Sequence, residues 1–215
     1  MAAVVAAVLQ LEAALSTGGN VAYARSMGVT PEDSALMLRY KDGDVAAFET
    51  LYRRHNDSLY RYLLRLSLNR DTAEDVFQEV WGKIIKARHS YRPTAKFTTF
   101  LYRVAHNCFI DYVRRNNRHL VSSAMDPDCS PDPGDEPDIK VEKSIARERL
   151  DAALGTLPDE QRDVFLLHEE AGLSIDTIAQ VTGVNRETVK SRLRYANRKL
   201  KTAMAEPAGQ TQRTA

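Results

Sequence analysis

The sequence predicts an all-α protein in which two small helical domains are joined by an acidic, proline-rich linker. Apolar residues recur at helical spacing along most of the chain, and no stretch alternates apolar and polar residues for long enough to form a sheet. Residues 126–138 hold acidic residues and prolines but no basic residue. Proline interrupts helices and like charges repel, so this segment is expected to remain extended.

The predicted boundaries follow from this linker. Residues 1–30 form an alanine-rich N-terminal extension, which is expected to be poorly ordered. The first domain spans 31–120, the linker 121–142, the second domain 143–205 and a C-terminal tail 206–215. The first domain should contain helices over about 44–68, 71–86 and 97–115, and the second should resume helix near residue 143 and again over 159–170.

Residues 171–201 predict a short helix, a glycine turn and a long basic helix. Ser174 can cap the first helix, Gly183 can close it in the left-handed conformation, and Asn185 can cap the second. The long helix has an inward apolar stripe of Val189, Leu193, Ala196 and Leu200. Its other faces are rich in lysine and arginine, a pattern typical of a helix-turn-helix that binds duplex DNA.

Basic amphipathic helices also occur as solvated faces of helical bundles and as tails that bind RNA or acidic lipids. The capped helix, glycine turn and capped basic helix together favour DNA. The chain's net charge is close to zero, but the acidic linker accounts for that balance, and the helical regions on either side of it are basic.

Composition argues against several other classes of protein. No apolar stretch is long enough to span a membrane, and residues 1–15 resemble a signal peptide poorly, so we expect a cytoplasmic protein. Cys108 and Cys129 lie in segments of opposite character, which makes a disulfide between them unexpected. The histidines have no zinc-ligand spacing, and neither a metal nor a cofactor is expected.

The second predicted helix carries an acidic face made of Glu74, Asp75, Gln78 and Glu79, with Asp71 at its start. Acidic residues in a first turn stabilise the helix dipole, which explains part of this face. Asp71, Asp75 and Glu79 could line a divalent-metal site, although no histidine completes it. A docking surface for a basic partner is the third interpretation, because Gln78 and Glu79 lie beyond the reach of the dipole effect.

The third predicted helix mixes aromatic and basic residues. Such a mixture suits single-stranded nucleic acid, because bases stack on rings while arginines contact the backbone. Phe97 shares a helical face with Leu101 and Cys108 and is equally compatible with the core. The candidate contact residues are Phe97, Thr99, Phe100, Arg103, Asn107, Arg114 and Arg115.

Taken together, these motifs resemble the extracytoplasmic-function sigma factors, a bacterial class of the sigma-70 superfamily. Residues 44–52, 73–80 and 97–107 resemble region 2, whereas Leu157 to Arg162 and the helix-turn-helix resemble region 4. Three positions depart from the usual pattern. Phe100 stands where tryptophan is frequent, Gly82 where a larger residue is usual, and Tyr195 where arginine is frequent.

The resemblance implies a non-enzymatic promoter-specificity subunit that assists minus-10 melting. Its expected partners are core RNA polymerase, through the β′ clamp and β flap, promoter DNA in duplex and single-stranded form, and an anti-sigma factor. The acidic face, Glu74, Asp75, Gln78 and Glu79, would bind polymerase, and the third helix would bind the minus-10 strand. The minus-35 duplex would be contacted by Arg186, Thr188, Lys190, Ser191, Arg192, Arg194 and Arg198.

Two other functions are compatible with parts of the pattern. A stand-alone helix-turn-helix regulator would bind its operator without polymerase, but it would leave the acidic face and the aromatic helix without a role. A metal-dependent nuclease would use Asp71, Asp75 and Glu79, yet the rest of a metal shell is missing from the sequence.

Overall fold

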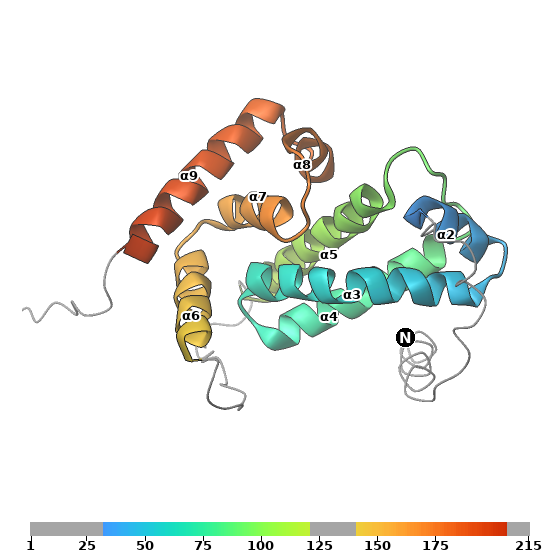
Figure 1. The fold of residues 1–215 in the computed structure, drawn as a ribbon, viewed down its shortest axis with the longest axis horizontal. Coiled ribbons are helices and arrows are strands. Elements are labelled where there is room, and N and C mark those ends of the chain that lie inside the picture. The colour runs from blue at the N-terminus through green and yellow to red at the C-terminus, as the bar shows by residue number, and fades with distance from the viewer. Residues whose placement is uncertain (1–31, 121–140, 206–215) are drawn as a thin grey trace, which may run out of the picture.

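The computed structural model describes residues 32–120 and 141–205, and within these ranges it consists of helices joined by turns and by a longer loop over 88–96 (Figure 1). The first group comprises α2 (Asp33–Lys41), α3 (Val45–Ser67), α4 (Arg70–Ala87) and α5 (Phe97–Leu120). The second comprises α6 (Val141–Gly155), α7 (Asp159–Glu169), α8 (Ile175–Thr182) and α9 (Arg186–Ala205). The all-α prediction is confirmed, while the N-terminal extension and the linker segment 121–140 lie outside the described residues.

The N-terminal group packs around an aromatic centre. Trp81 of α4 is 1% exposed, and its ring lies 4.9 Å from that of Tyr52 and 5.7 Å from that of Phe48, both on α3. Aromatic pairs at such distances add to the free energy gained by burying their area. Helix α5 completes this core with Phe97, which is also buried. Cys108 lies here too, and burial raises the pKa of its thiol.

Side chains cap these helices at positions that the sequence marks. Asp44 Oδ1 accepts a hydrogen bond from the Ala47 amide at 3.2 Å at the start of α3, and Asn69 Oδ1 accepts one from Thr72 at 2.8 Å at the start of α4. Each cap satisfies an amide that has no partner within the helix. Leu68 ends α3 with φ 56°, a left-handed conformation that is uncommon for leucine.

Helix α2 was not expected from the sequence. Its Leu36, Met37 and Tyr40 are buried against the N-terminal core, and Tyr40 stacks on Phe48 with ring centroids 4.6 Å apart. The apolar residues of this short segment are nearly consecutive, so helical periodicity is faint there. The helix is stabilised by packing rather than by a clear amphipathic pattern.

The C-terminal group forms a compact unit in which α9 lies across α7 and α8 (Figure 1). Val189, Ala196 and Leu200 of α9 are buried, and Leu193 is partly buried against the same core. The predicted inward stripe is therefore confirmed. Ile178 of α8 and Leu166 of α7 contribute to this core from the other side.

The glycine turn between α8 and α9 provides a test of this local structure. Gly183 has φ 72°, so Gly183→Ala should lower the free energy of unfolding by about 1–2 kcal/mol, because a Cβ disfavours the left-handed conformation. Gly155→Ala is the control, since its Cβ would meet Leu68 Cδ1 at an ordinary 3.6 Å. Urea denaturation measures both variants. Equal stability of the Gly183→Ala protein and the wild type would contradict the prediction.

Candidate polymerase and nucleic-acid interfaces

The structure forms the predicted helix-turn-helix from α8 and α9. Ser174 Oγ accepts a hydrogen bond from the Thr177 amide at 3.2 Å, and Asn185 Oδ1 accepts one from the Thr188 amide at 2.8 Å. Gly183 closes α8 in the left-handed conformation. These contacts confirm both caps and the turn. They fix the direction in which α9 leaves the turn, and hence which of its faces is presented outward.

Most candidate minus-35 side chains occupy the exposed part of α9, and several contact acidic neighbours. Lys190 Nζ is 2.8 Å from Glu187 Oε1, and Arg186 Nε is 3.3 Å from Asp176 Oδ1. Arg192 turns toward α7, where it pairs with Glu160. Thr188 is half-buried, and its carbonyl accepts a hydrogen bond from Ser191 Oγ at 2.9 Å.

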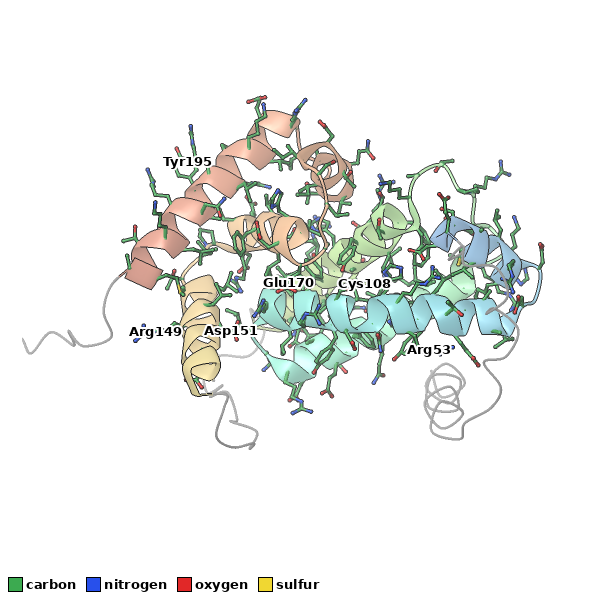
Figure 2. The ribbon with its side chains drawn as sticks, in the orientation of Figure 1. Arg53, Cys108, Arg149, Asp151, Glu170 and Tyr195 are labelled. Atoms are coloured by element: carbon green, nitrogen blue, oxygen red, sulfur yellow. The ribbon has the colours of Figure 1, made fainter. Side chains whose placement is uncertain are left out.

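Tyr195 lies on the outward side of α9, away from α7 (Figure 2). Arg194 and Arg198 both place their guanidinium groups over its ring, 5.5 Å and 5.0 Å from the ring centroid. Such cation–π contacts restrict the motion of the two arginines. The position where the family frequently has arginine thus holds a ring that orders two neighbouring arginines.

The acidic face of α4 is divided into exposed and internally paired residues. Asp75 and Gln78 are exposed. Glu74 accepts hydrogen bonds from Arg70 Nε at 2.9 Å and from the Tyr60 hydroxyl at 3.4 Å. Asp75 and Gln78 are therefore the members most accessible to a partner.

Glu79 connects the candidate polymerase face to the candidate minus-10 helix. Its carboxylate lies 2.8 Å from Arg115 Nη2 of α5 and 2.9 Å from Lys83 Nζ. Partial burial alone would raise the pKa of Glu79, but the hydrogen bonds from Arg115 and Lys83 outweigh it, and the pKa lies below its usual value. Arg115 thus contacts an acidic residue of its own chain.

The candidate minus-10 residues of α5 differ widely in exposure. Phe97 is 1% exposed and Thr99 6%, so both belong to the interior of this structure. Phe100 is half-buried, and its ring centroid lies 5.3 Å from that of Tyr91. The remaining candidates, Arg103, Asn107, Arg114 and Arg115, are exposed.

The two helical groups contact each other directly, which the sequence did not indicate. Asp163 of α7 accepts a hydrogen bond from the Tyr62 hydroxyl at 2.6 Å and lies 2.8 Å from His106 Nδ1. Arg162 Nη1 donates to the carbonyl of Leu66 at 2.9 Å. The two partners of each contact are widely separated in the chain, so no local pattern could reveal them.

In the described parts of the chain, no three histidine, cysteine, aspartate or glutamate side chains are grouped as a metal ion would require. Of the residues suggested for a metal site, Glu79 is already engaged by Arg115 and Lys83. Across residues 32–120 and 141–205, no helix is both long and apolar enough to cross a membrane.

Comparison with known protein families agrees with this architecture. Residues 51–119 match the family model for Sigma-70 region 2, and residues 147–200 match that for Sigma-70 region 4. The first match spans α3 to α5, and the second spans α6 to α9. The chain therefore combines two DNA- and polymerase-associated modules of one superfamily.

Curated relatives define the class more closely. The chain is 33% identical over 178 residues to the ECF RNA polymerase sigma factor SigE of Mycolicibacterium smegmatis, covering 80% of this chain and 68% of that protein. It is 32% identical over 168 residues to SigM of Mycobacterium tuberculosis, covering 78% and 82%. The chain belongs to the extracytoplasmic-function RNA polymerase sigma factors. This membership disfavours the stand-alone regulator.

Solved structures share the fold. A sigma factor RpoE from Bartonella quintana, solved with the anti-sigma factor NepR, gives a TM-score of 0.62 at 21% identity over 73% of this chain and 96% of that chain. CnrH, solved with the cytosolic domain of CnrY, gives a TM-score of 0.57 at 23% identity over 79% and 95%.

The environment of Glu79 yields a measurable prediction. In Arg115→Gln, the pKa of Glu79 should rise toward its usual value, because a hydrogen bond to the ionised carboxylate is lost. Titration of the Glu79 side-chain carboxyl by NMR measures this. Arg70→Gln is the control, because Arg70 pairs with Glu74 instead. A fall in the pKa of Glu79 in Arg115→Gln would contradict the structure.

Proposed function

We propose that this sigma factor divides its work between its two helical groups. The exposed residues of α4 bind core RNA polymerase, α5 binds the melted minus-10 strand, and α9 binds the minus-35 duplex. The protein itself makes and breaks no covalent bond, and it acts in the cytoplasm, where the polymerase transcribes. The observation that carries the proposal is the pairing of a capped, outward-facing basic helix with a separate exposed acidic face.

The minus-35 contact follows from the shape and charge of α9. An α-helix fits the major groove, and Arg194 lies near the middle of the outward face. Arg186, Thr188, Lys190, Ser191 and Arg198 complete this surface, with Arg192 at its edge. In the protein without DNA, some of these basic side chains form ion pairs with acidic neighbours, as Lys190 does with Glu187. DNA phosphates would replace the acidic partners in those ion pairs.

Capture of the minus-10 strand would use the exposed part of α5. Phe100 offers a partly accessible ring for stacking, and Arg103 and Asn107 lie about one and two turns further along the same side of the helix. Because Phe97 and Thr99 are buried, they would support this surface from beneath unless α5 shifts. Melting would be driven by differential binding, since an unstacked base gains contacts that a paired base cannot make.

The polymerase contact would use Asp75 and Gln78 as its most accessible residues, with Glu74 and Glu79 at their sides. By family resemblance the partner is the β′ clamp, with the β flap contacting the C-terminal domain. An anti-sigma factor is a further proposed partner, because the structurally similar sigma factor RpoE was solved with the anti-sigma factor NepR. The structurally similar CnrH was likewise solved with a bound protein, the cytosolic domain of CnrY.

The polymerase interface is tested by Asp75→Ala combined with Gln78→Ala. Affinity for core enzyme should fall about tenfold or more, as expected when central interface residues are truncated. Asp57→Asn, an exposed acidic change on α3, is the control. Fluorescence titration of labelled sigma factor with core enzyme measures both, and undiminished affinity in the double variant would reject this interface.

The minus-35 interface is tested by Arg194→Gln. Promoter binding by the reconstituted holoenzyme should weaken, and the slope of log affinity against log salt should flatten by about 0.9 if one phosphate contact is lost. Lys199→Gln removes the same charge from the side of α9 where Lys199 Nζ donates to the Thr156 carbonyl at 2.7 Å. Indistinguishable effects of the two changes would remove the special role of Arg194.

A further inference from the structure

The basic side chains in the two halves of α9 are held in different ways. Residues 193–204, in the second half, contain neither aspartate nor glutamate. Arg194 and Arg198 lie there, and both place their guanidinium groups over the ring of Tyr195, which points outward from the helix (Figure 2). In the first half, the basic side chains that pair with carboxylates are Arg186, Lys190 and Arg192.

A ring and a carboxylate hold an arginine by different chemistry. A carboxylate accepts hydrogen bonds from the guanidinium N–H groups, so a phosphate must displace it before it can use those donors. An aromatic ring attracts the guanidinium charge through its face, and the N–H groups stay available for hydrogen bonds. Arg194 and Arg198 are therefore ordered by Tyr195 while their donors can still contact DNA.

The ring also keeps the two arginines close to each other. Arg194 and Arg198 are four residues apart on α9, so they lie on the same side of the helix, where like charges repel. The centroid of the Tyr195 ring lies 5.5 Å from Cζ of Arg194 and 5.0 Å from Cζ of Arg198. The negative face of the ring offsets part of the repulsion. Two positive charges are thus held together on one side of α9.

The position of this pair along α9 indicates which part of the DNA it would contact. In a helix-turn-helix, the first turns of the second helix reach base edges in the major groove. Arg194 and Arg198 lie in the third and fourth turns of the 20-residue α9. Side chains that far along the helix lie at the edge of the groove, where the phosphates are the available acceptors.

We propose that Tyr195 is a positioning residue for duplex DNA, whose ring holds Arg194 and Arg198 ready to contact phosphates at the edge of the minus-35 groove. This inference rests on the proposed function of α9 and adds a residue that was not among the candidate contacts. Tyr195 is 42% exposed, but its role is to order the two arginines rather than to contact a base. Arginines that are ordered before binding lose less conformational entropy when DNA binds.

The first test compares Tyr195→Leu with Tyr195→Phe, which keeps the ring and removes only the hydroxyl. Holoenzyme containing each full-length variant is titrated onto a fluorescent duplex that the wild-type holoenzyme enriches from a randomised pool. Tyr195→Leu should lower affinity about fivefold or more, because two arginine side chains must then be ordered on binding. Tyr195→Phe should bind like the wild type. Met204→Ala, which truncates another exposed apolar side chain of α9, is the control and should also bind like the wild type.

A double-mutant cycle separates positioning from direct contact with DNA. In a protein that carries Arg194→Gln and Arg198→Gln, the ring has no arginine to hold, so adding Tyr195→Leu should change affinity by less than about twofold. This comparison is made at low salt, where the remaining phosphate contacts are strongest. In the free protein, NMR relaxation of the Nε–H groups of Arg194 and Arg198 should show greater mobility in Tyr195→Leu than in Tyr195→Phe. Circular dichroism reports whether each variant is folded.

The role of Tyr195 is overturned if Tyr195→Leu binds as tightly as the wild type, or if Tyr195→Phe loses as much affinity as Tyr195→Leu. It is also overturned if Tyr195→Leu costs as much affinity without the two arginines as with them, because the ring would then contact DNA itself. Equal mobility of the arginines in the two Tyr195 variants overturns it as well.

The proposed function is scored separately by the selection. If the wild-type holoenzyme enriches no duplex beyond core enzyme alone, the proposed function is rejected, and this inference with it. If a duplex is enriched but the Tyr195 variants do not behave as expected, only the positioning role of Tyr195 is rejected.

Discussion

A buried carboxylate lies at the centre of the contact between the two domains. Asp163 is 6% exposed, and its two oxygens contact the Tyr62 hydroxyl of α3 and His106 of α5. A carboxylate removed from water without such partners would be costly, so the contact holds only when α3, α5 and α7 meet in this geometry. Burial, together with the neighbouring Asp163, raises the pKa of Tyr62 well above its ordinary value and keeps its hydroxyl a donor.

This dependence distinguishes the two helices that we propose to bind DNA. Helix α9 presents its basic side chains outward, and its shape is determined inside the C-terminal domain by caps and an apolar stripe. Helix α5 faces the C-terminal domain on one side, where Arg103 Nη2 donates to the carbonyl of Gln180 at 3.2 Å. In the proposed function, the surface for duplex DNA is therefore built within one domain, whereas the surface for the single strand borders the other domain.

The features that could be predicted from the sequence are those that local interactions determine. Ser174, Gly183 and Asn185 act within four residues of themselves, and the stripe from Val189 to Leu200 needs only helical periodicity. The helix α2 and the left-handed Leu68 were missed, because tertiary packing outweighs weak local preference there.

The contact between Tyr62 and Asp163 joins residues 101 positions apart, and no spacing in the sequence could indicate it. Contacts between distant residues were also missed at the candidate polymerase-binding face. Residue type and helical face identified the exposed Asp75 and Gln78, but not the ion pair of Glu79 with Arg115 on another helix.

The burial of Cys108 determines how its thiol responds to oxidants. Its sulfur is enclosed in the N-terminal core, and burial keeps the thiol protonated by raising its pKa. Peroxides and electrophiles react with exposed thiolates, so this cysteine is chemically inert while the domain is folded. A cell could therefore use this factor during an oxidant burst without damage at that position, and any redox signal controlling it would have to be received elsewhere.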